Sequence, residues 1–128
     1  MIALLAALAL ASQTPPEDRD CDDAMNQSEL NFCAARNFEK ADAELNRQFR
    51  AVITELRADG FDYDDGRQSG EQKLREAQRA WIIFRDAHCT LEAYESRGGS
   101  MEPMLYNGCR ARITRERIVQ LRPTPSER

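Results

Sequence analysis

The sequence has little proline and glycine, a single histidine and a single tryptophan. Five prolines and six glycines in 128 residues are too few for a collagen-like or low-complexity chain. A mean hydropathy of -0.67 excludes a bundle of membrane helices. An excess of basic residues is also missing: the formal charge is -4, which argues against nucleic acid as a partner, because proteins that bind phosphate backbones are usually basic. What is present, 41% hydrophobic residues in 14.6 kDa, predicts one small soluble domain with its own core.

Charge is distributed unevenly along the chain. Residues 1–66 contain 14 acidic and 6 basic residues, a net charge of -8, whereas residues 67–128 contain 8 acidic and 12 basic residues, a net charge of +4. A solvated charged face explains such counts, and so does attraction of a basic partner to the acidic half.

Residues 1–11 are expected to form a signal peptide. The apolar run from Ile2 to Ala11 ends with small residues at Ala9 and Ala11, the pattern that signal peptidases recognise. The run has about half of the roughly 20 residues that a membrane-spanning helix needs. We therefore expect an exported chain, periplasmic or secreted, without a membrane span and with a polar lead-in over residues 12–27.

An even number of cysteines in a chain expected to be exported indicates two disulfides rather than free thiols. The four are Cys21, Cys33, Cys89 and Cys109. No Cys-x-x-Cys spacing occurs, and His88 is the one histidine, so a tetrahedral zinc site would need all four cysteine sulfurs or an unusual mixture of ligands. We expect neither a metal nor another cofactor.

Apolar residues recur at helical spacing in three segments, and no strand is predicted. The first helix is expected over residues 28–58, with Asn26 and Glu29 as a capping box and an apolar face formed by Leu30, Ala34, Phe38, Ala41, Leu45, Phe49, Val52 and Leu56. The second follows a capping box of Ser69 and Gln72 and ends at Gly98 and Gly99. Its inner face is expected to carry Leu74, Ala77, Ala80, Trp81, Ile83, Phe84, Ala87, His88, Leu91 and Tyr94.

The third helix is expected to start at Ser100 as its cap, with Pro103 in the first turn, and to end before Pro123. Met104, Ala111, Ile118 and Leu121 mark its inner side. The sequence thus predicts an all-α, antiparallel three-helix domain over residues 28–122, with a long helical hairpin and a flexible tail over residues 123–128.

The hairpin between the second and third helices constrains the disulfides. Cys89 lies ten residues before Gly99 and Cys109 ten residues after it, so an antiparallel turn places both at the same height. By height alone, Cys33 is also near Cys89. We favour Cys89 with Cys109 and, by elimination, Cys21 with Cys33, which would hold the lead-in against the first helix.

Several short motifs occur together along the chain. They are Cys33-Ala34, Ala41-Asp42-Ala43-Glu44-Leu45-Asn46, Leu74-x-x-Ala77-Gln78-x-x-Trp81-x-x-Phe84-Arg85-Asp86-x-x-Cys89, Gly98-Gly99-Ser100, Cys109 and Thr114-x-x-Arg117-x-x-x-Leu121. This pattern resembles the LprI-like family, small exported bacterial helical proteins that include members described as lysozyme inhibitors. The resemblance covers residues 21–121 and implies the same fold and an inhibitory activity.

Five residues beside the predicted core are interpreted as structural: Asp42, Asn46, Gln78, Trp81 and Arg85. Arg85 and Asp42 are placed for an ion pair between the second and first helices. The Trp81 ring is expected to pack against small Ala41. Gln78 and Asn46 are expected to form hydrogen bonds between helices.

No catalytic constellation is found. His88 and Cys89 are neighbours, but adjacent side chains on a helix point about 100° apart and cannot share a proton directly. A glycosidase pair of carboxylates needs a substrate cleft, which a short helical bundle does not offer. Serine nucleophile motifs and glycine-rich phosphate loops are absent from the sequence. We therefore expect that the protein is not an enzyme.

The acidic segment between the first two helices is the candidate binding site. Phe61, Asp62, Tyr63, Asp64 and Asp65 combine carboxylates that attract a basic surface with aromatic rings that anchor on it. A calcium loop would place glycine at position 6, whereas Gly66 falls at position 5. A mobile solvated loop explains the same composition.

Two functions remain after these exclusions. Lysozymes are generally basic, so an acidic, disulfide-linked helical protein is suited to bind one and occlude its cleft. The alternative is an envelope interaction module with a different, non-lysozyme partner.

Overall fold

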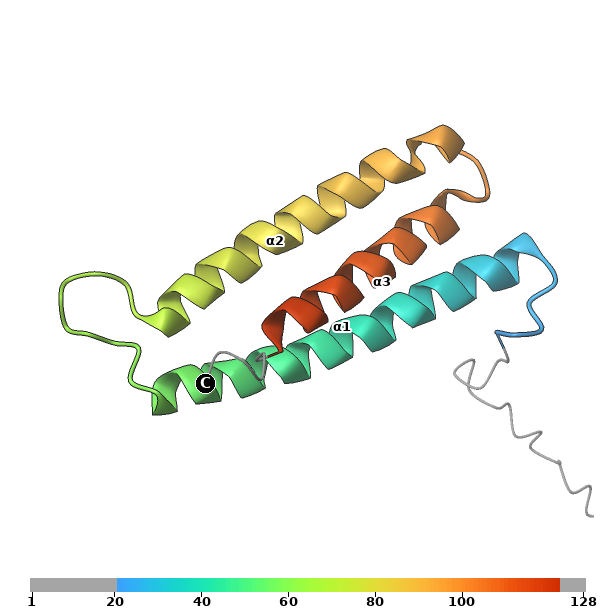
Figure 1. Cartoon of the computed structure of the whole chain (residues 1–128). Coiled ribbons are helices and arrows are strands. Elements are labelled where there is room, and N and C mark those ends of the chain that lie inside the picture. The colour runs from blue at the N-terminus through green and yellow to red at the C-terminus, as the bar shows by residue number, and fades with distance from the viewer. Residues whose placement is uncertain (1–20, 123–128) are drawn as a thin grey trace, which may run out of the picture.

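The computed structural model describes residues 21–122 and contains three helices joined by two short connections (Figure 1). They are α1 (Gln27–Ala58), α2 (Gly70–Glu92) and α3 (Glu102–Leu121), with a 3₁₀ helix, η2 (Ala93–Ser96), directly after α2. The described residues form no strand, so the all-α prediction is confirmed. The signal peptide and the tail predicted over residues 1–11 and 123–128 lie outside the described residues. None of the helices within residues 21–122 is both long enough and apolar enough to cross a bilayer.

The starts of α1 and α2 follow from their capping residues. Asn26 accepts a hydrogen bond from the backbone N–H of Glu29 at 2.9 Å, and the Glu29 carboxylate accepts one from the N–H of Met25 at 2.9 Å. At α2 the capping box is complete, since Ser69 Oγ accepts from Gln72 N and Gln72 Oε1 accepts from Ser69 N. These bonds satisfy N–H groups that the first helical turn leaves unpaired.

The start of α3 differs from the prediction. Its N-cap is Met101, and Ser100 makes no capping bond with its side chain. The Glu102 carboxylate instead accepts a hydrogen bond from the N–H of Gly98 at 2.6 Å. Gly98 has a φ of +77°, a conformation that glycine adopts without steric cost. A carboxylate in the first turn therefore closes this hairpin in place of the predicted serine.

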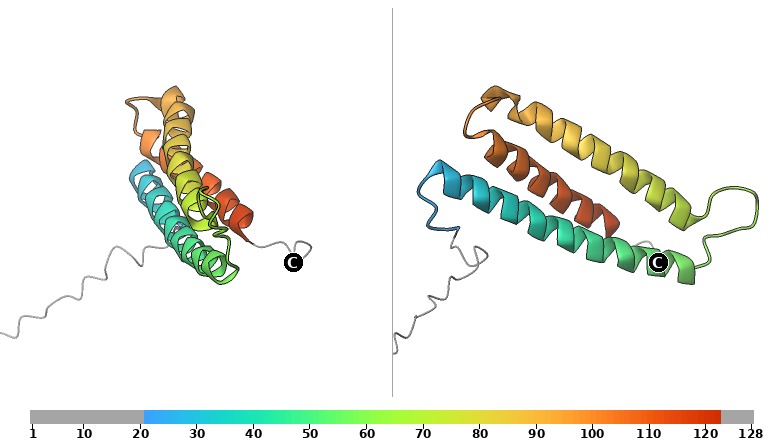
Figure 2. Two further views of the ribbon diagram at one scale, coloured as in Figure 1. Left: turned by 90° about the vertical axis from the view of Figure 1, so that its left-hand side faces the viewer. Right: turned by 180° about the vertical axis from the view of Figure 1, so that it is seen from behind.

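The three helices run antiparallel in sequence order, up, down and up. Both predicted disulfides are confirmed. α1 packs mainly along α3, whereas α2 contacts α3 more than α1 (Figures 1 and 2). Cys89 and Cys109 link α2 to α3 with a Cα separation of 5.5 Å, and Cys21 and Cys33 hold the lead-in against α1 at 5.6 Å. The core is thin and its members are small or medium in size: Ala41, Leu45, Ile53, Cys89, Ala93, Cys109, Ala111, Ile113 and Ile118.

The predicted inner face of α2 is wrong. Its buried residues are Gln78, Arg85 and Cys89, whereas Phe84 is 56% and Leu91 65% exposed. The disulfide explains this orientation, because Cys89 must point at Cys109 and helical residues rotate by about 100° each. Gln78 and Arg85 share the side of Cys89. Most of the expected stripe, namely Ala77, Ala80, Ile83, Phe84, Ala87, His88, Leu91 and Tyr94, is exposed to solvent.

Candidate functional site

The acidic loop, defined as residues 59–69, projects from the end of the molecule opposite η2 (Figure 1). Its ends are held together by a hydrogen bond from the N–H of Gly70 to the carbonyl of Phe61 at 2.8 Å. The rings of Phe61 and Tyr63 meet edge to face with centroids 6.4 Å apart, and both are exposed. Asp64 has a φ of +49°, a left-handed conformation that aspartate tolerates better than most residues. The loop therefore presents a paired aromatic cluster to solvent.

The carboxylates of the acidic loop differ in their surroundings. Asp65 accepts hydrogen bonds from the Arg67 guanidinium at 2.7 Å and from the Arg67 N–H at 3.0 Å. The Arg67 side chain holds the pKa of the Asp65 carboxyl below its usual value. Asp62 and Asp64 form no ion pair with any described residue, and Asp62 accepts only from the N–H of Asp64, at 3.4 Å. The charges of Asp62 and Asp64 are therefore available to a basic partner.

Phe61 borders two shallow hollows. The larger, about 650 Å³, is bounded by Phe61, Tyr63, Asp65, Arg67 and Lys73 together with loop backbone. The smaller, about 240 Å³, lies between the loop and the end of α1, next to Leu56 and Asp62. Both are open to solvent, which suits docking of a protruding side chain better than enclosure of a small substrate.

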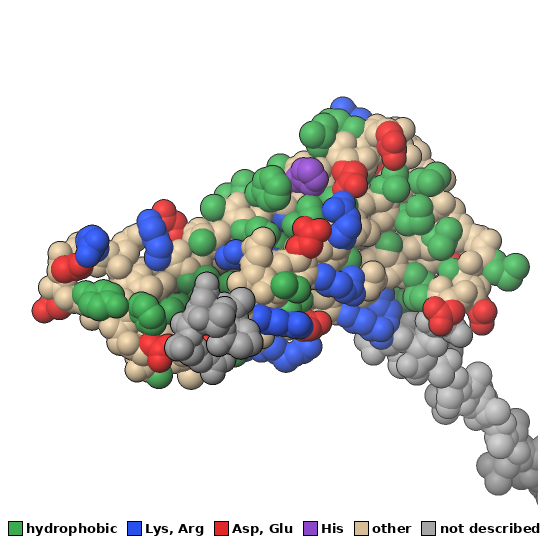
Figure 3. Space-filling view, viewed as in Figure 1, with side chains coloured by type: hydrophobic (Ala, Val, Ile, Leu, Met, Phe, Trp, Pro, Cys, Tyr) green, Lys and Arg blue, Asp and Glu red, His purple; other side chains and the backbone are tan. Residues whose placement is uncertain are grey.

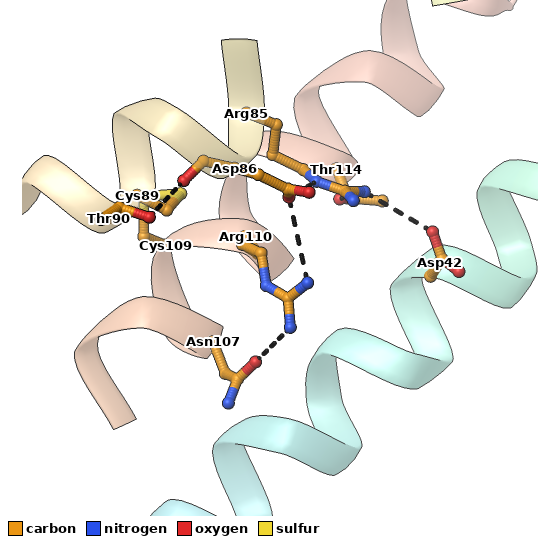
Figure 4. Close-up of polar contacts among 9 residues, drawn as sticks. All are labelled: Asp42, Arg85, Asp86, Cys89, Thr90, Asn107, Cys109, Arg110 and Thr114. Atoms are coloured by element: carbon orange, nitrogen blue, oxygen red, sulfur yellow. Dashed lines mark hydrogen bonds and ion pairs between the residues drawn. A yellow bond between two sulfur atoms is a disulfide. The ribbon is translucent and has the colours of Figure 1, made fainter. Parts of the chain in front are cut away.

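Two of the predicted structural residues, Asp42 and Arg85, meet at a second place, around the guanidinium of Arg85 on α2 (Figure 4). Its Nε donates to Asp86 at 2.9 Å, and its NH1 lies 3.6 Å from Asp42 on α1 and 3.4 Å from Thr114 on α3. The Arg85 side chain is only 7% exposed. One buried cation thus contacts side chains of all three helices, and this cluster has the geometry of a structural clamp.

Aromatic rings complete the surroundings of the clamp. The Arg85 guanidinium lies 4.9 Å from the ring centroid of Phe38 and 5.1 Å from that of Trp81. Trp81 packs against the disulfide cluster of Cys89, Cys109 and Ile113. Such cation–π contacts are each worth about 0.5 to 2 kcal/mol.

Sequence reasoning missed one member of the clamp and misplaced another residue. Arg110 on α3 lies 3.7 Å from the Phe38 centroid and donates to Asn107 at 2.6 Å. The sequence signal that could have found Arg110 was its position directly after Cys109, because the disulfide turns Cys109 towards α2. Gln78 does link helices, accepting from Arg117 Nε at 3.1 Å. Asn46, in contrast, is exposed and makes no side-chain hydrogen bond to another described residue, so the expected bond is wrong.

One group of possible metal ligands occurs within residues 21–122. The ligand atoms of His88, Glu92 and Cys109 lie within 4.8 Å of one another. Cys109 is bonded to Cys89, so its sulfur is not a thiolate and cannot act as a metal ligand. The two remaining residues are too few for a structural metal site.

Comparisons with known proteins identify the family of this chain. A family described as "Lysozyme inhibitor LprI" matches residues 19–121. An uncharacterized protein of Rhizobium meliloti is 43% identical over 122 residues, which cover 93% of this chain and 87% of the relative. No solved structure matches the chain. The family is one of inhibitors rather than catalysts, and the two disulfides fit an oxidising compartment. From the match over residues 19–121, we conclude that the chain belongs to the LprI family of lysozyme inhibitors.

Proposed function

We propose that this protein is an exported lysozyme inhibitor that binds the enzyme through the acidic loop and occludes its substrate cleft. The observation that carries the proposal is the exposed pair of rings, Phe61 and Tyr63, set beside the unpaired carboxylates of Asp62 and Asp64. Aromatic side chains dominate the energetics of many protein interfaces, and unpaired charges raise the rate of association with an oppositely charged surface.

The rest of the molecule supports a protein partner. The loop is anchored at both ends by helices, and the capping box at Ser69 fixes the place where it rejoins α2. The loop is therefore presented on a scaffold that two disulfides constrain. A rigid scaffold limits the conformational entropy that is lost on binding. The signal peptide expected over residues 1–11 would direct this activity to the periplasm or outside the cell.

The test is a lysis assay in which purified, oxidised protein is added to lysozyme and bacterial cell walls. We expect inhibition that saturates as the protein reaches molar excess over the enzyme. A reduced and alkylated sample serves as the control, because it loses the disulfides and keeps the sequence. Unchanged lysis with several lysozyme types would contradict the proposal, and enrichment of another envelope protein on the immobilised chain would favour the non-lysozyme alternative.

Charge reversal in the acidic loop tests its role. In an Asp62→Lys/Asp64→Lys variant, we expect association with lysozyme to slow by roughly tenfold or more at low salt and to lose most of its salt dependence, because opposite charges steer encounter. Stopped-flow measurements at several salt concentrations give both quantities.

A Glu39→Lys/Glu95→Lys variant is the matched control. Both residues are exposed, lie away from the acidic loop and make no ion pair with another described residue, and the change in net charge is the same. Equal slowing in the two variants would assign steering to net charge alone and remove the acidic loop from the mechanism.

A further inference from the structure

The solvent side of α2 carries a continuous apolar seam. We define the α2 seam as five residues of α2 and one of η2, which are spaced by 3, 4, 3, 4 and 3 positions and are all exposed: Ala77, Ala80, Phe84, Ala87 and Leu91, followed by Tyr94 in η2. Ile83, 71% exposed, widens the seam on one flank. Figure 3 shows hydrophobic side chains on both sides of the histidine along the edge of the molecule where α2 lies. Contiguous exposed apolar surface of this kind marks an interaction site.

The α2 seam is not a by-product of packing against the other helices. The opposite side of α2 faces the core with Gln78, Arg85 and Cys89, so the polar residues point inwards and the apolar residues point outwards. No other part of residues 21–122 covers the seam, because its side chains are exposed along its whole length. The pattern therefore calls for a partner outside this chain.

Apolar residues spaced alternately by 3 and 4 positions are typical of a helix that pairs side by side with another helix. We propose that the α2 seam pairs with the α2 seam of a second copy of this chain, antiparallel and related by a two-fold axis. In such a pair each contact occurs twice, once on each side of the axis.

The sizes of the side chains select the antiparallel arrangement. With the axis between Phe84 and Ala87, Phe84 faces Ala87 of the second copy, Ala80 faces Leu91, and Ala77 faces Tyr94. Every level then combines one small and one large side chain, which allows close helix packing without gaps or overlap. A parallel pair would oppose alanine with alanine and phenylalanine with phenylalanine, leaving voids at some levels and crowding at others.

The flanks of the seam agree with this arrangement. At flanking positions of an antiparallel pair, Ile83 meets Ile83 of the second copy and extends the apolar contact. Glu76 meets Thr90, Trp81 meets Glu95, and His88 meets His88, so none of these contacts opposes two carboxylates or two Lys or Arg side chains. The seam is therefore complementary to itself in size and free of charge repulsion at these contacts.

Sedimentation of the oxidised, full exported chain tests the proposal. We expect the mass to rise from one chain to two as concentration increases towards roughly 100 µM, as mass action requires for a reversible dimer. Phe84→Glu/Leu91→Glu should remain monomeric over the same range, with an unchanged helical circular dichroism spectrum. Val119→Glu is the matched control, because Val119 on α3 is 63% exposed, close to the 65% of Leu91, and lies outside the seam.

Orientation is tested by crosslinking, since all four native cysteines are in disulfides. A short bismaleimide should join Ala80→Cys chains to Leu91→Cys chains in a mixture much more efficiently than it joins either variant to itself. A monomeric wild-type chain over the whole range, or a dimer that survives Phe84→Glu/Leu91→Glu, would overturn the proposal. The proposal would also be overturned if the wild type stayed monomeric and Phe84→Glu/Leu91→Glu lost lysozyme inhibition. The α2 seam would then bind the enzyme rather than a second copy of this chain.

Discussion

Replacing Cys89 and Cys109 together with alanine is expected to lower the free energy of unfolding by about 3 to 5 kcal/mol. The bond closes a loop with a sequence separation of 20, for which loss of chain entropy in the unfolded state alone accounts for about 3 kcal/mol. Both sulfurs are also buried in a thin core, with Cys89 fully buried, so their removal takes packing contacts from Ile113 and Trp81. Because domains of this size are stable by about 5 to 15 kcal/mol, the loss is a large part of the total.

Urea denaturation followed by circular dichroism measures this change. Cys21→Ala/Cys33→Ala is the comparison, since its bond closes a shorter loop, with a separation of 12, and Cys21 is exposed. We expect that variant to lose about 2 kcal/mol, at the lower end of the range for disulfides. If the two double variants lost the same free energy, the buried bond would have no role beyond chain entropy.

The second large effect concerns the buried cation on α2. Arg85→Ala is expected to cost about 3 kcal/mol, because it leaves a void between three helices and removes partners from Asp42, Asp86 and Thr114 together. Arg85→Lys should recover less than half of that loss, because a single ammonium cannot contact all these groups and stack between two rings. Thermal or urea unfolding with calorimetric confirmation of two-state behaviour provides the measurement.

Asp42→Asn separates the ion pair from the packing. The Asp42 side chain is 42% exposed, so solvent screens its attraction to Arg85, and we expect a loss below about 1 kcal/mol. A loss for Asp42→Asn as large as that for Arg85→Ala would show that the ion pair, rather than packing and ring contacts, dominates the clamp.

Much of the fold could be predicted from local residues. Asn26 and Ser69 fixed the starts of two helices because capping is a short-range interaction that sequence displays directly. The pairing of Cys89 with Cys109 followed from equal distances to the turn at Gly99. The predicted end of the second helix, at Gly98 and Gly99, lies beyond the observed end of α2 at Glu92. The reason is that η2 follows Glu92 directly and is a tighter helix with similar local preferences.

The rotation of α2 could not be predicted from periodicity. An apolar stripe is ordinarily the side that a helix buries, and the stripe through Phe84 and Leu91 is stronger than the one through Gln78 and Arg85. The disulfide nevertheless sets the rotation, because only one side of α2 can bring Cys89 to Cys109. Applying 100° per residue from Cys89 would have placed Arg85 inside and Leu91 outside.

The position of the acidic loop could be predicted from the sequence, whereas its role as a binding site stays a prediction. Acidic and aromatic residues between two segments of helical spacing located the acidic loop, whereas the ion pair of Asp65 with Arg67 depends on a tight turn that composition does not specify. The ion pair with Arg67 neutralises Asp65, one of the five predicted binding residues, and leaves the other four available to a partner.

We propose that the acidic loop forms the contact between this protein and lysozyme. Isothermal titration of basic lysozymes with the oxidised protein, at low and high salt, tests it most directly. We predict a saturable complex with one chain bound per enzyme, weaker at high salt and lost or strongly weakened in Asp62→Lys/Asp64→Lys. Absence of binding to every lysozyme tested, or a complex of unchanged affinity in that variant, would contradict the claim.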